Sequence, residues 1–474
     1  MDEKNGELIF MERRKSYENK NILVLGLAKS GYMAAQLLHK LGAEVTVNDA
    51  QDLSNHPDAL VLMELGISVI SGGHPDDLLE ADFDLLVKNP GIPYSNSILI
   101  QAKAKGIPIV TEVEIATSVM QAHIIGLTGT NGKTTTTSMI QSFLSNDRNK
   151  GRALALGNIG VPASQMALEV TSEDDVILEL SSFQLMGTPT IKPEIALILN
   201  LSSAHLDYHG SQEAYEDAKM NLIRQQGPED VVIYNKDQKH LEKLVLENTK
   251  AQLLPFSRRE YLKEGISVKD ESIYFKGEKV ADVSEIFLHG LHNLENFLAA
   301  IGVAKLKGVS NGTIHKVLQN FKGVKHRTQY LTEHAGRIFY NDSKATNIEA
   351  TQNALAGFKQ PVVLLAGGLD RGISYEALIP SFSKHVKAIV AFGETAASIK
   401  EVAEKAGVSN VQVVENVEEA VPVAYQLSEP GDVILLSPAS ASWDQYPSFE
   451  IRGERYIEAV ENLIAREKGE GFKG

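Results

Sequence analysis

The stretch "IIGLTGTNGKTTTTSMI", residues 124–140, has the pattern of a buried strand, a glycine turn and the start of a helix. Lys133 and Thr134 stand at the turn, as they do in loops that bind nucleotide phosphates. The standard phosphate-loop pattern also needs a glycine five residues before Gly132, and that position is Leu127. The pattern is therefore missed by one residue. The alternative is an ordinary strand-to-helix turn, which gives the lysine at the bend no role.

The chemistry of a phosphate loop is still available here. Backbone N–H groups of residues 129–132 can point inward at a helix N-terminus, Lys133 can reach terminal phosphate oxygens, and Thr134 can bind Mg²⁺. We therefore predict an ATP-binding loop, formed by Gly129, Thr130, Asn131, Gly132, Lys133, Thr134 and Thr135.

Length and composition limit the class of protein. A chain of 474 residues suggests three domains at roughly 150 residues each. With 43% apolar and 23% charged residues, the composition is that of a globular protein. The sequence lacks a run of about 18 apolar residues, and its charged start "MDEKNGELIFMERRKSYENK" does not resemble a secretory signal. We expect a cytoplasmic protein that does not bind membranes.

Charge and cysteine content exclude further classes. The absence of cysteine excludes disulfides, thiolate nucleophiles and Cys-based zinc sites, so any metal must be bound by oxygen or imidazole ligands. The net charge of -15, without a cluster of Lys and Arg, argues against a nucleic-acid partner.

Strands and helices alternate along the chain, which predicts α/β domains with parallel sheets. The first domain, residues 1–112, contains the apolar segments "NILVLGL", "AEVTVND", "FDLLVKNPGIP" and "IPIVTEVE", with a helix over about 30–41. The second, residues 113–323, contains "DVILELSS", "EIALILNLSS" and "DVVIYN", with polar hairpins between about 250 and 285. The third, residues 324–474, contains "RIFYNDSKATN", "PVVLLAGGLDRG", "AIVAFGE" and "GDVILLSPASASWDQYPSFEIRGERY".

The segment "LVLGLAKSG", residues 23–31, follows a strand, and Asp49 ends the next one, as in dinucleotide-binding folds. The second glycine of that fingerprint is Ala28 here, which disfavours close approach to a pyrophosphate. A site for a different nucleotide, or a structural turn, explains the segment better than NAD.

Other candidate residues follow the predicted loop. Glu179 ends a buried strand, where carboxylates often face Mg²⁺, although a solvated strand-end acid is an equal alternative. His205 follows another strand and Lys219 lies on a predicted helix, where each is more often structural. Asn158, in "GNIG", is a neutral donor or a turn residue. In the segment "HNLENFLAA", Asn293 and Asn296 are three residues apart, which places them on one face of a helix. The alternative is a helix cap and its neighbour.

In combination these segments resemble one family. The motifs "GLTGTNGKTT", "LELSSFQL", "LNLSSAHLDYHG", "HNLENFLAA", "HRTQ", "NDSKATN" and "LLSPASASWDQYPSFEIRGE" are similar to those of the Mur ligases of peptidoglycan synthesis. The resemblance runs from about Ile22 to Tyr456. It implies a Rossmann-like N-terminal domain, a central P-loop ATPase-like domain and a Rossmann-like C-terminal domain.

The resemblance also implies a reaction. Members of this family use ATP to convert a carboxylate into an acyl phosphate, which the amine of an incoming amino acid attacks. The motifs favour the branch that joins D-glutamate to UDP-N-acetylmuramoyl-L-alanine (UDP-MurNAc-L-Ala). Catalysis of this kind depends mostly on positioning and charge neutralisation.

By resemblance, Lys133 binds the β- and γ-phosphates and Asn158 contacts the reacting carboxyl region. Two Mg²⁺ ions are expected, on Thr134, Glu179, His205 and Lys219. The last residue matches a lysine that the family carries as a carbamate, and a carbamate would supply anionic oxygen where an ammonium would repel Mg²⁺.

The remaining expected contacts also come from the resemblance. Those with ATP are Asn293, Asn296, Arg327 and Asp342. Those with the UDP substrate are Leu27, Ala28, Asp49 and Ala50, with Ser181 and Gln184 as further substrate contacts. Those with D-glutamate are Lys344, Thr346, Ser442 and Phe449. Arg371 stands where the family often has lysine, so its role stays open.

Several alternatives remain at this point. "NDSKATN" could simply cap a helix, with Thr346 or Asn347 as the N-cap. A folylpolyglutamate synthetase would share the ATP loop, but the order of the domains and "SASWDQYPSFEIRGE" argue against it. A ligase for dibasic amino acids would carry an acidic motif that "LAGGLDRGISY" does not resemble. An NAD-binding regulator and a nonenzymatic scaffold explain fewer motifs. We expect a monomer.

Overall fold

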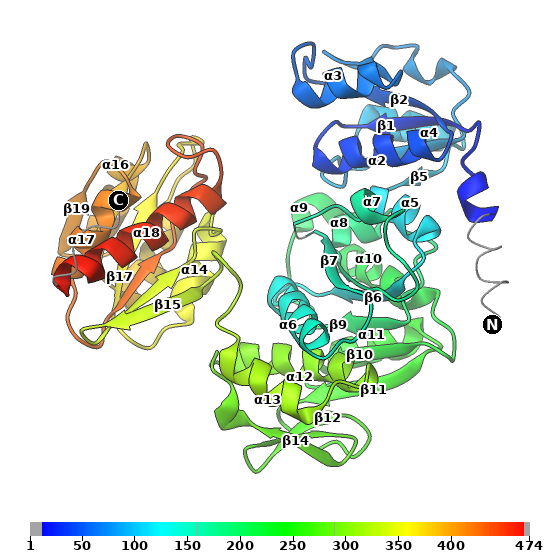
Figure 1. The fold of residues 1–474 in the computed structure, drawn as a ribbon. Coiled ribbons are helices and arrows are strands. Elements are labelled where there is room, and N and C mark those ends of the chain that lie inside the picture. Colours follow the sequence, from blue (N-terminus) through cyan, green and yellow to red (C-terminus); the bar gives the residue numbers. More distant parts are fainter. Residues whose placement is uncertain (1–11, 159, 289, 469–474) are drawn as a thin grey trace. The chain divides into compact units, whose positions relative to one another are not determined.

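The computed structural model describes residues 12–158, 160–288 and 290–468. Its chain divides into two compact units, one up to Asn320 and the other from Phe321 onward. The first unit contains two β-sheets and the second contains one, each with helices around it (Figure 1). The predicted class, α/β with three sheet-containing domains, is confirmed.

The first sheet has five parallel strands in the order β3-β2-β1-β4-β5, as expected for a Rossmann-like half. The strands are β1 (Asn21–Leu25), β2 (Glu44–Asn48), β3 (Ser68–Ile70), β4 (Leu85–Lys88) and β5 (Ile109–Val110). The helices of this part are α2 (Lys29–Lys40), α3 (Pro57–Glu64) and α4 (Ser97–Ala104).

The expectation that "IPIVTEVE" forms a strand was wrong for most of its length. Only Ile109–Val110 pairs with the sheet, and α5 (Glu112–Val119) begins directly afterwards. Thr111 occupies the N-cap position in an extended conformation, and two acidic residues stand in the first turn. Negative charge at a helix N-terminus is favourable, so the acids support a helix that the β-branched residues do not suggest.

The second sheet has nine strands in the order β14-β13-β12-β11-β10-β9-β6-β8-β7. Their bounds are β6 (His123–Thr128), β7 (Ala153–Gly157), β8 (Asp175–Glu179), β9 (Ile195–Ile198), β10 (Val231–Asn235), β11 (Gln252–Ser257), β12 (Ile266–Lys269), β13 (Ser272–Phe275) and β14 (Glu278–Asp282). The pairs β12–β13 and β13–β14 are antiparallel, which confirms the hairpins predicted in this region.

Helices surround this sheet and complete the first unit. They are α6 (Lys133–Asn146), α7 (Ala163–Met166), α8 (Ser182–Leu185), α9 (Leu206–His209), α10 (Gln212–Arg224), α11 (Lys239–Asn248), α12 (Leu291–Leu306) and α13 (Asn311–Asn320). Helices α6 and α12 both pack on the sheet and against each other, and Asn296 of α12 lies close to Gly132, so α12 lies beside the predicted ATP loop (Figure 1).

The second unit has a six-stranded sheet in the order β15-β16-β20-β17-β18-β19. Its strands are β15 (Gln329–His334), β16 (Arg337–Asn341), β17 (Val362–Gly367), β18 (Val386–Phe392), β19 (Asn410–Val413) and β20 (Val433–Leu436). Only β15 runs antiparallel to its neighbour. The helices are α14 (Ile348–Ala356), α15 (Ile379–His385), α16 (Ala396–Lys405), α17 (Val417–Leu427) and α18 (Phe449–Glu467).

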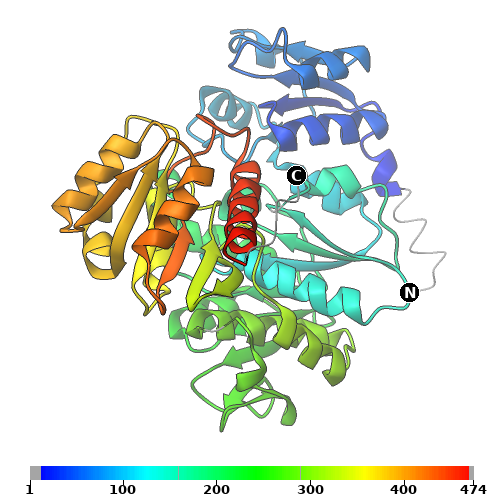
Figure 2. The same cartoon turned by 60° about the vertical axis from the view of Figure 1, so that its left-hand side comes forward.

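The long helix α18 lies beside α17 on one face of this sheet (Figures 1 and 2). Tyr456 and Val460 pack with Phe339 and Ile434 in the apolar core of that face. Arg452 lies one turn earlier on the same side of the helix and is fully buried. The helix therefore carries a charged side chain into the interior of the unit.

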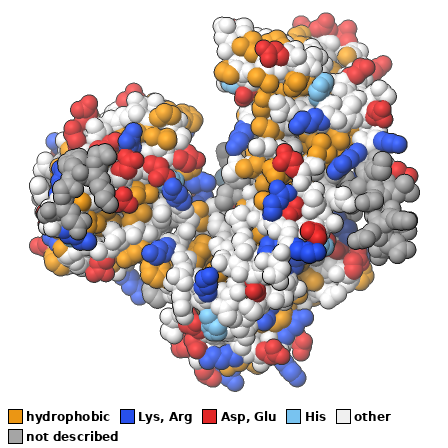
Figure 3. All heavy atoms as spheres, viewed as in Figure 1, with side chains coloured by type: hydrophobic (Ala, Val, Ile, Leu, Met, Phe, Trp, Pro, Cys, Tyr) orange, Lys and Arg blue, Asp and Glu red, His pale blue; other side chains and the backbone are white. Residues whose placement is uncertain are grey.

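The predicted domain boundaries at residues 112 and 323 remain predictions. The first lies at the start of α5, and the second lies close to the division between the two units. On the face shown in Figure 3, basic and acidic side chains are interspersed. None of the helices within the described residues has the length and hydropathy needed to cross a membrane.

Candidate active site

The predicted ATP loop lies at the carboxyl edge of the second sheet. Strand β6 lies between β9 and β8, so strands that follow it in the sequence lie on both of its sides. Such a switch point leaves a crevice beyond the strand ends. The loop of residues 129–132 follows β6, Glu179 ends β8, and Asn200 follows β9, so all three reach the same edge.

The loop is held by two asparagines. Asn200 Oδ1 accepts from the N–H of Asn131 at 2.8 Å, and Asn200 Nδ2 donates to the Asn131 carbonyl at 3.0 Å. On the other side, a Cβ atom at Gly132 would lie 2.2 Å from Oδ1 of Asn296. Because Gly132 also has φ +80°, glycine is required here for both the backbone and the close approach of α12.

Lys133 begins α6 and bends back over the loop. Its Nζ donates to the carbonyl oxygens of Gly129 at 2.8 Å and Thr130 at 2.9 Å. The ammonium therefore lies at the mouth of the loop, at the helix N-terminus, where an anion is favoured. The predicted strand, turn and helix are confirmed, although the roles of the loop residues in binding ATP remain predictions.

Glu179 and Asn158 form a pair beside the loop. Asn158 Nδ2 donates to Oε1 of Glu179 at 2.9 Å, and its N–H donates to the Glu179 carbonyl. The side chain of Glu179 is buried, and within the described residues its Oε2 lacks a hydrogen-bond partner. An unsatisfied buried carboxylate oxygen is costly unless a cation or a donor from a ligand reaches it.

These groups fit Mg²⁺. Thr134 is buried in the first turn of α6, and Glu179 supplies a carboxylate oxygen. In the part of the chain that the structure describes, three or more His, Asp or Glu side chains do not gather into a metal cluster. Mg²⁺ commonly takes one or two carboxylates and completes its shell with phosphates and water, so the Glu179 carboxylate and the Thr134 hydroxyl are suitable ligands for it.

His205 lies in an aromatic cluster next to this edge. Its backbone has φ +55°, a conformation that is sparsely populated by residues with a side chain and is often found at functional sites. The ring of Phe183 lies 4.9 Å from that of His205 and 4.4 Å from that of Tyr208. His205 is exposed, so its imidazole remains accessible from solvent.

Lys219 is buried behind the ATP loop. Its Nζ donates to the Gly129 carbonyl at 2.9 Å and to Thr128 Oγ1 at 3.3 Å, and it lies 4.7 Å from the centre of the Tyr215 ring. Burial lowers the pKa of this amine well below its ordinary value, and the charge of Lys133 lowers it further. Lys219 is therefore much closer to its neutral form than an exposed lysine.

Among the expected UDP contacts, Asp49 has a clear structural role. Its carboxylate accepts from the N–H of Leu27 at 2.7 Å and from that of Gln51 at 2.9 Å, which ties the turns after β1 and β2 together. The Leu27 side chain belongs to the core, so only its backbone can meet a ligand. Ala28 and Ala50 are exposed on the same turns.

Ser181 and Gln184 are engaged with each other. Gln184 Oε1 accepts from the N–H of Ser181 at 3.0 Å, and Ser181 Oγ accepts from the N–H of Gln184 at 3.3 Å. This reciprocal pair is a capping box at the start of α8. It explains both residues structurally, and their contact with a substrate remains a prediction.

In the second unit, three loops meet at the carboxyl ends of β16, β20 and β17. Arg452 reaches all of them: its guanidinium donates to the carbonyls of Ser343 at 2.9 Å, Ser440 at 3.0 Å and Gly367 at 3.4 Å. Burial lowers the pKa of Arg452 to about 10, so the side chain stays charged at neutral pH. This buried arginine positions the loops that carry the predicted amino-acid site.

The residues expected to bind D-glutamate lie on these loops. Lys344 Nζ lies 5.5 Å from the ring centre of Phe449, and Ser343 Oγ donates to the Phe449 carbonyl at 2.7 Å. Ser442 is buried, and its Oγ lacks a hydrogen-bond partner within the described residues. Arg371 stacks on Trp443, with its guanidinium carbon 5.1 Å from the ring centre.

The helix-cap alternative for "NDSKATN" is correct for one residue. Asn347 is the N-cap of α14, and its Oδ1 accepts from the N–H of Ala350 at 2.9 Å. Thr346 precedes the cap and is half-buried, so its hydroxyl is not used for this purpose.

Asp342 and Arg327 lie near each other in the second unit. Asp342 accepts from the N–H of Thr328 and from the hydroxyl of Ser437, both at 2.9 Å. Burial nevertheless raises the pKa of Asp342 to about 6, although these bonds and the charge of Arg327 oppose the rise. Arg327 keeps a buried Nε that lacks a partner among the described residues.

Asp342→Asn is expected to stabilise the protein at pH 7.5 and to have little effect on stability below pH 4. The folded protein holds the Asp342 proton up to about pH 6, whereas the unfolded chain releases it near pH 4. Stability contributed by this group is therefore present at low pH and is lost as the pH rises from about 4 to 6. Thermal unfolding across this range measures the effect, and a difference between variants that does not change with pH would contradict it.

Comparison with known proteins identifies the family. Residues 20–111 match the N-terminal domain described as Mur ligase MurD-like, residues 127–304 match the Mur ligase middle domain, and residues 326–440 match the Mur ligase glutamate ligase domain. UDP-N-acetylmuramoylalanine--D-glutamate ligase from Lactiplantibacillus plantarum is 51% identical over 456 residues, 96% of this chain and 99% of the relative. The protein of that name from Enterococcus faecalis is 52% identical, with 96% and 99% covered. This chain belongs to the Mur ligase family.

Solved Mur ligases share the fold at low sequence identity. MurF from Acinetobacter baumannii matches with a TM-score of 0.56 and 18% identity, over 94% of this chain and 92% of that one. UDP-N-acetylmuramate-alanine ligase MurC from Thermotoga maritima matches with a TM-score of 0.53 and 18% identity, over 94% and 99%. These likenesses support the three-domain fold of the Mur ligase.

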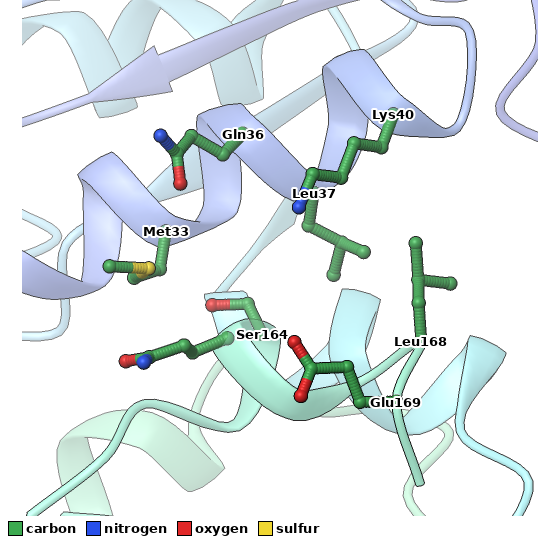
Figure 4. Close-up of a pocket in the computed structure, with 8 residues that line it drawn as sticks. Met33, Gln36, Leu37, Lys40, Ser164, Leu168 and Glu169 are labelled. Carbon is green, nitrogen blue, oxygen red and sulfur yellow. The ribbon is translucent and has the colours of Figure 1, made fainter. Parts of the chain in front are cut away.

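One cavity in the Mur ligase lies apart from the predicted site. It has a volume of about 190 Å³ and separates α2 of the first sheet domain from α7 of the second (Figure 4). Its lining residues are Met33, Gln36, Leu37, Lys40, Ser164, Gln165, Leu168 and Glu169. The residues predicted to act in the reaction are absent from this lining.

Sequence analysis of the Mur ligase missed three residues that shape the site. Asn200 clamps the ATP loop, Tyr215 bonds to Thr130 through a hydroxyl pair at 2.8 Å, and Arg452 joins the loops of the second unit. A signal existed for the arginine, because it shares the i, i+4, i+8 spacing of buried residues with Tyr456 and Val460.

Proposed function

We propose that this chain is an ATP-dependent ligase that joins D-glutamate to UDP-MurNAc-L-Ala in peptidoglycan synthesis. The observation that carries the proposal is the match of 51–52% identity, nearly end to end, to relatives named for this reaction. The grouping of a phosphate loop, a buried carboxylate and a buried amine of lowered pKa supports the same chemistry.

The reaction needs two bond exchanges. A carboxylate oxygen of the acceptor attacks the γ-phosphorus of ATP, ADP leaves, and an acyl phosphate forms. The amine of D-glutamate then attacks the acyl carbon, an amide forms, phosphate leaves, and the amine releases a proton. A carboxylate alone does not react in this way, because its leaving group would be oxide.

In this proposal the residues of the first unit bind and orient the reacting groups. Lys133 and the N–H groups of its loop hold the terminal phosphates, and Asn158 faces the acceptor carboxyl group. Mg²⁺ on Thr134 and Glu179, with a second ion near His205, would neutralise charge on the phosphates. The unsatisfied Oε2 of Glu179 supports this placement.

Lys219 is proposed to carry a carbamate. Carbamate formation joins a neutral amine to CO₂ with release of a proton, so it needs an amine that is not protonated. The lowered pKa of Lys219 supports this step. The resulting anionic oxygens would attract Mg²⁺, whereas an ammonium group would repel it.

The remaining contacts of ATP and the UDP group are proposed from the resemblance. Asn296 supports this proposal by its contact with the ATP loop, and Asn293 lies one turn earlier on α12. Arg327 and Asp342 are proposed to bind phosphate and ribose. The exposed turns that Asp49 ties together are proposed to bind uridine.

The D-glutamate site is proposed to lie on the loops of the second unit. Glutamate brings two carboxylates, and the site must hold both so that only the amine approaches the acyl phosphate. Lys344 supplies charge, Thr346 and Ser442 supply hydroxyl donors, and Arg371 is a candidate for the second carboxylate. The partnerless hydroxyl of Ser442 supports a ligand contact there.

Ser442→Ala is expected to raise the KM for D-glutamate about tenfold or more and to leave the KM for ATP almost unchanged. A hydrogen bond to a charged group contributes roughly 1.5–3 kcal/mol. The Ser442 hydroxyl has no partner among the described residues, so its loss should cost little stability. Steady-state kinetics and thermal unfolding measure both effects.

Ser440→Ala is the matched control for this variant. The Ser440 hydroxyl bonds to the hydroxyl of Tyr375 at 2.7 Å, inside the same loop region. This control is expected to lower stability with a smaller effect on the KM for D-glutamate. If Ser442→Ala instead destabilises the protein and leaves that KM unchanged, the pocket assignment is wrong.

Phosphate release tests the whole proposal. Purified enzyme is assayed with ATP and Mg²⁺ against a matrix of UDP-muramoyl acceptors and amino acids. Release is expected only when UDP-MurNAc-L-Ala and D-glutamate are present together. Release with L-glutamate and a folate acceptor, but not with this pair, would overturn the proposal.

A further inference from the structure

Lys88 is a buried lysine that the proposed mechanism does not use. It ends β4, where the chain enters the loop "NPGIP" of residues 89–93. Only 1% of the residue is exposed. Lysine is rarely buried to this extent without a partner, so the contacts of its ammonium group require an explanation.

The partners of this ammonium group are neutral. Nζ donates to the Pro90 carbonyl at 3.1 Å and to the Tyr208 hydroxyl at 3.3 Å, and it lies 4.9 Å from the ring centre of Tyr94. Burial lowers the pKa of Lys88 to about 8, so most of the amine remains protonated at neutral pH. The charge is stabilised by carbonyl and hydroxyl dipoles and by the face of an aromatic ring.

Tyr208 continues the connection into the second sheet domain of the same unit. Its hydroxyl lies 3.0 Å from the carbonyl oxygens of both Pro90 and Ile92, to either of which it can donate. Tyr208 belongs to α9, a single turn that begins immediately after His205. The hydroxyl therefore joins this turn to the loop of the first domain, and Lys88 completes the junction by donating to it.

Both ends of the junction lead to predicted site residues. On the first-domain side, Asn89 Nδ2 donates to Ser30 Oγ at 3.2 Å, and a Cβ atom at Gly26 would lie 3.0 Å from Asn89 Cβ. The loop thus packs on the turn after β1. On the other side, the Tyr208 ring packs edge-on against Phe183, which also contacts His205.

We propose that Lys88 and Tyr208 form a buried clasp that positions His205 for the ligation reaction by fixing α9 to the loop of residues 89–93 in the first domain. Lys88 is a positioning residue, because it acts through Tyr208 and does not touch the reacting groups. The clasp explains how the left-handed backbone of His205 is maintained on a turn of only four residues. Only the expected effect of the clasp on kcat rests on the proposed function.

Two substitutions test the clasp. Lys88→Met keeps the length and the apolar stem of the side chain, and Tyr208→Phe removes only a hydroxyl. Lys20→Met is the control, because Lys20 lies in the same domain and forms a surface ion pair with Asp84. Each clasp variant is expected to lower kcat at least tenfold, with the KM for ATP within twofold of wild type. The double variant should fall little further, because the two residues act as one unit.

Hydrogen exchange gives a readout that does not depend on activity. The N–H groups of Tyr208 and His209 bond to the His205 carbonyl at 3.2 and 3.0 Å, and that of Gly210 bonds to the Leu206 carbonyl at 2.8 Å. These amides are expected to exchange at least tenfold faster in both clasp variants, while amides of α6 exchange as in wild type.

The outcomes separate the clasp from the proposed function. Unchanged exchange in residues 208–210, or a kcat within twofold of wild type in an active enzyme, would overturn the clasp. An equal increase of exchange throughout the unit would show general destabilisation and would also overturn it. If Lys88→Met does not fold, Tyr208→Phe decides. If wild type releases no phosphate with any substrate pair, the proposed function fails and exchange alone judges the clasp.

Discussion

Lys133→Ala is expected to lower kcat at least a hundredfold while the protein remains folded. The variant removes the cation at the mouth of the ATP loop, where Nζ is held 2.8 Å from the Gly129 carbonyl. Charge that develops on a phosphoryl group is stabilised by groups already in position, and loss of one such group costs roughly a hundred- to a thousandfold. Steady-state phosphate release and thermal unfolding measure the two quantities.

Loss of Lys133 should also change the pKa of the neighbouring Lys219. Its charge contributes to the lowered pKa of Lys219, so the alanine variant should raise that pKa and make the amine harder to carbamylate. Lys239→Ala is the matched control, since this exposed lysine of the same unit pairs with Glu242 in a surface ion pair. A Lys133→Ala enzyme that retains a tenth of the wild-type rate would show that the loop is structural.

Lys219→Met is expected to abolish measurable turnover, with kcat at least a hundredfold below wild type. The variant cannot form a carbamate, so the site loses the anionic oxygens that we assign to this position. In wild type, removal of bicarbonate and CO₂ should lower activity at least tenfold, and their return should restore it. The methionine variant should show no response to bicarbonate.

The same substitution has a predictable effect on stability. The folded-state pKa of Lys219 lies below its unfolded value, so the unfolded chain binds the proton more tightly. This opposes folding at neutral pH, and the penalty disappears as the pH rises towards the unfolded pKa of about 10.4. In buffer without CO₂, Lys219→Met should therefore melt at a higher temperature than wild type at pH 7.5. Wild-type activity that is indifferent to CO₂, with an unmodified lysine in the active protein, would contradict the carbamate.

Local patterns predicted the ATP loop and the central strands well. The segment around Lys133 combines an apolar strand, glycines and a helix start within 17 residues, so neighbouring residues determine its structure. Glu179 was placed correctly at a strand end because β8 is a short, continuously buried segment. Edge strands such as β15 and β19 were not predicted, since they are only partly buried and lack a clear apolar pattern.

The parts that sequence analysis missed depend on contacts between distant segments. Asn200 clamps Asn131 across 69 positions of sequence, and Lys88 meets Tyr208 across 120. Neither residue type marks a site by itself, and a lysine at the end of a strand is usually interpreted as exposed. The helix α5 was missed for a different reason, because its β-branched residues favour a strand while the acidic residues of its first turn favour a helix.

The buried arginine of α18 has a consequence for the order of biosynthesis. A chain is made from its N-terminus and its domains generally fold as they emerge. The strands β16, β17 and β20 all precede Arg452 in the chain, yet their loops depend on that side chain for a shared anchor. A nascent chain can therefore form its ATP loop early, but it gains an ordered amino-acid pocket only when the last helix has been synthesised and docked.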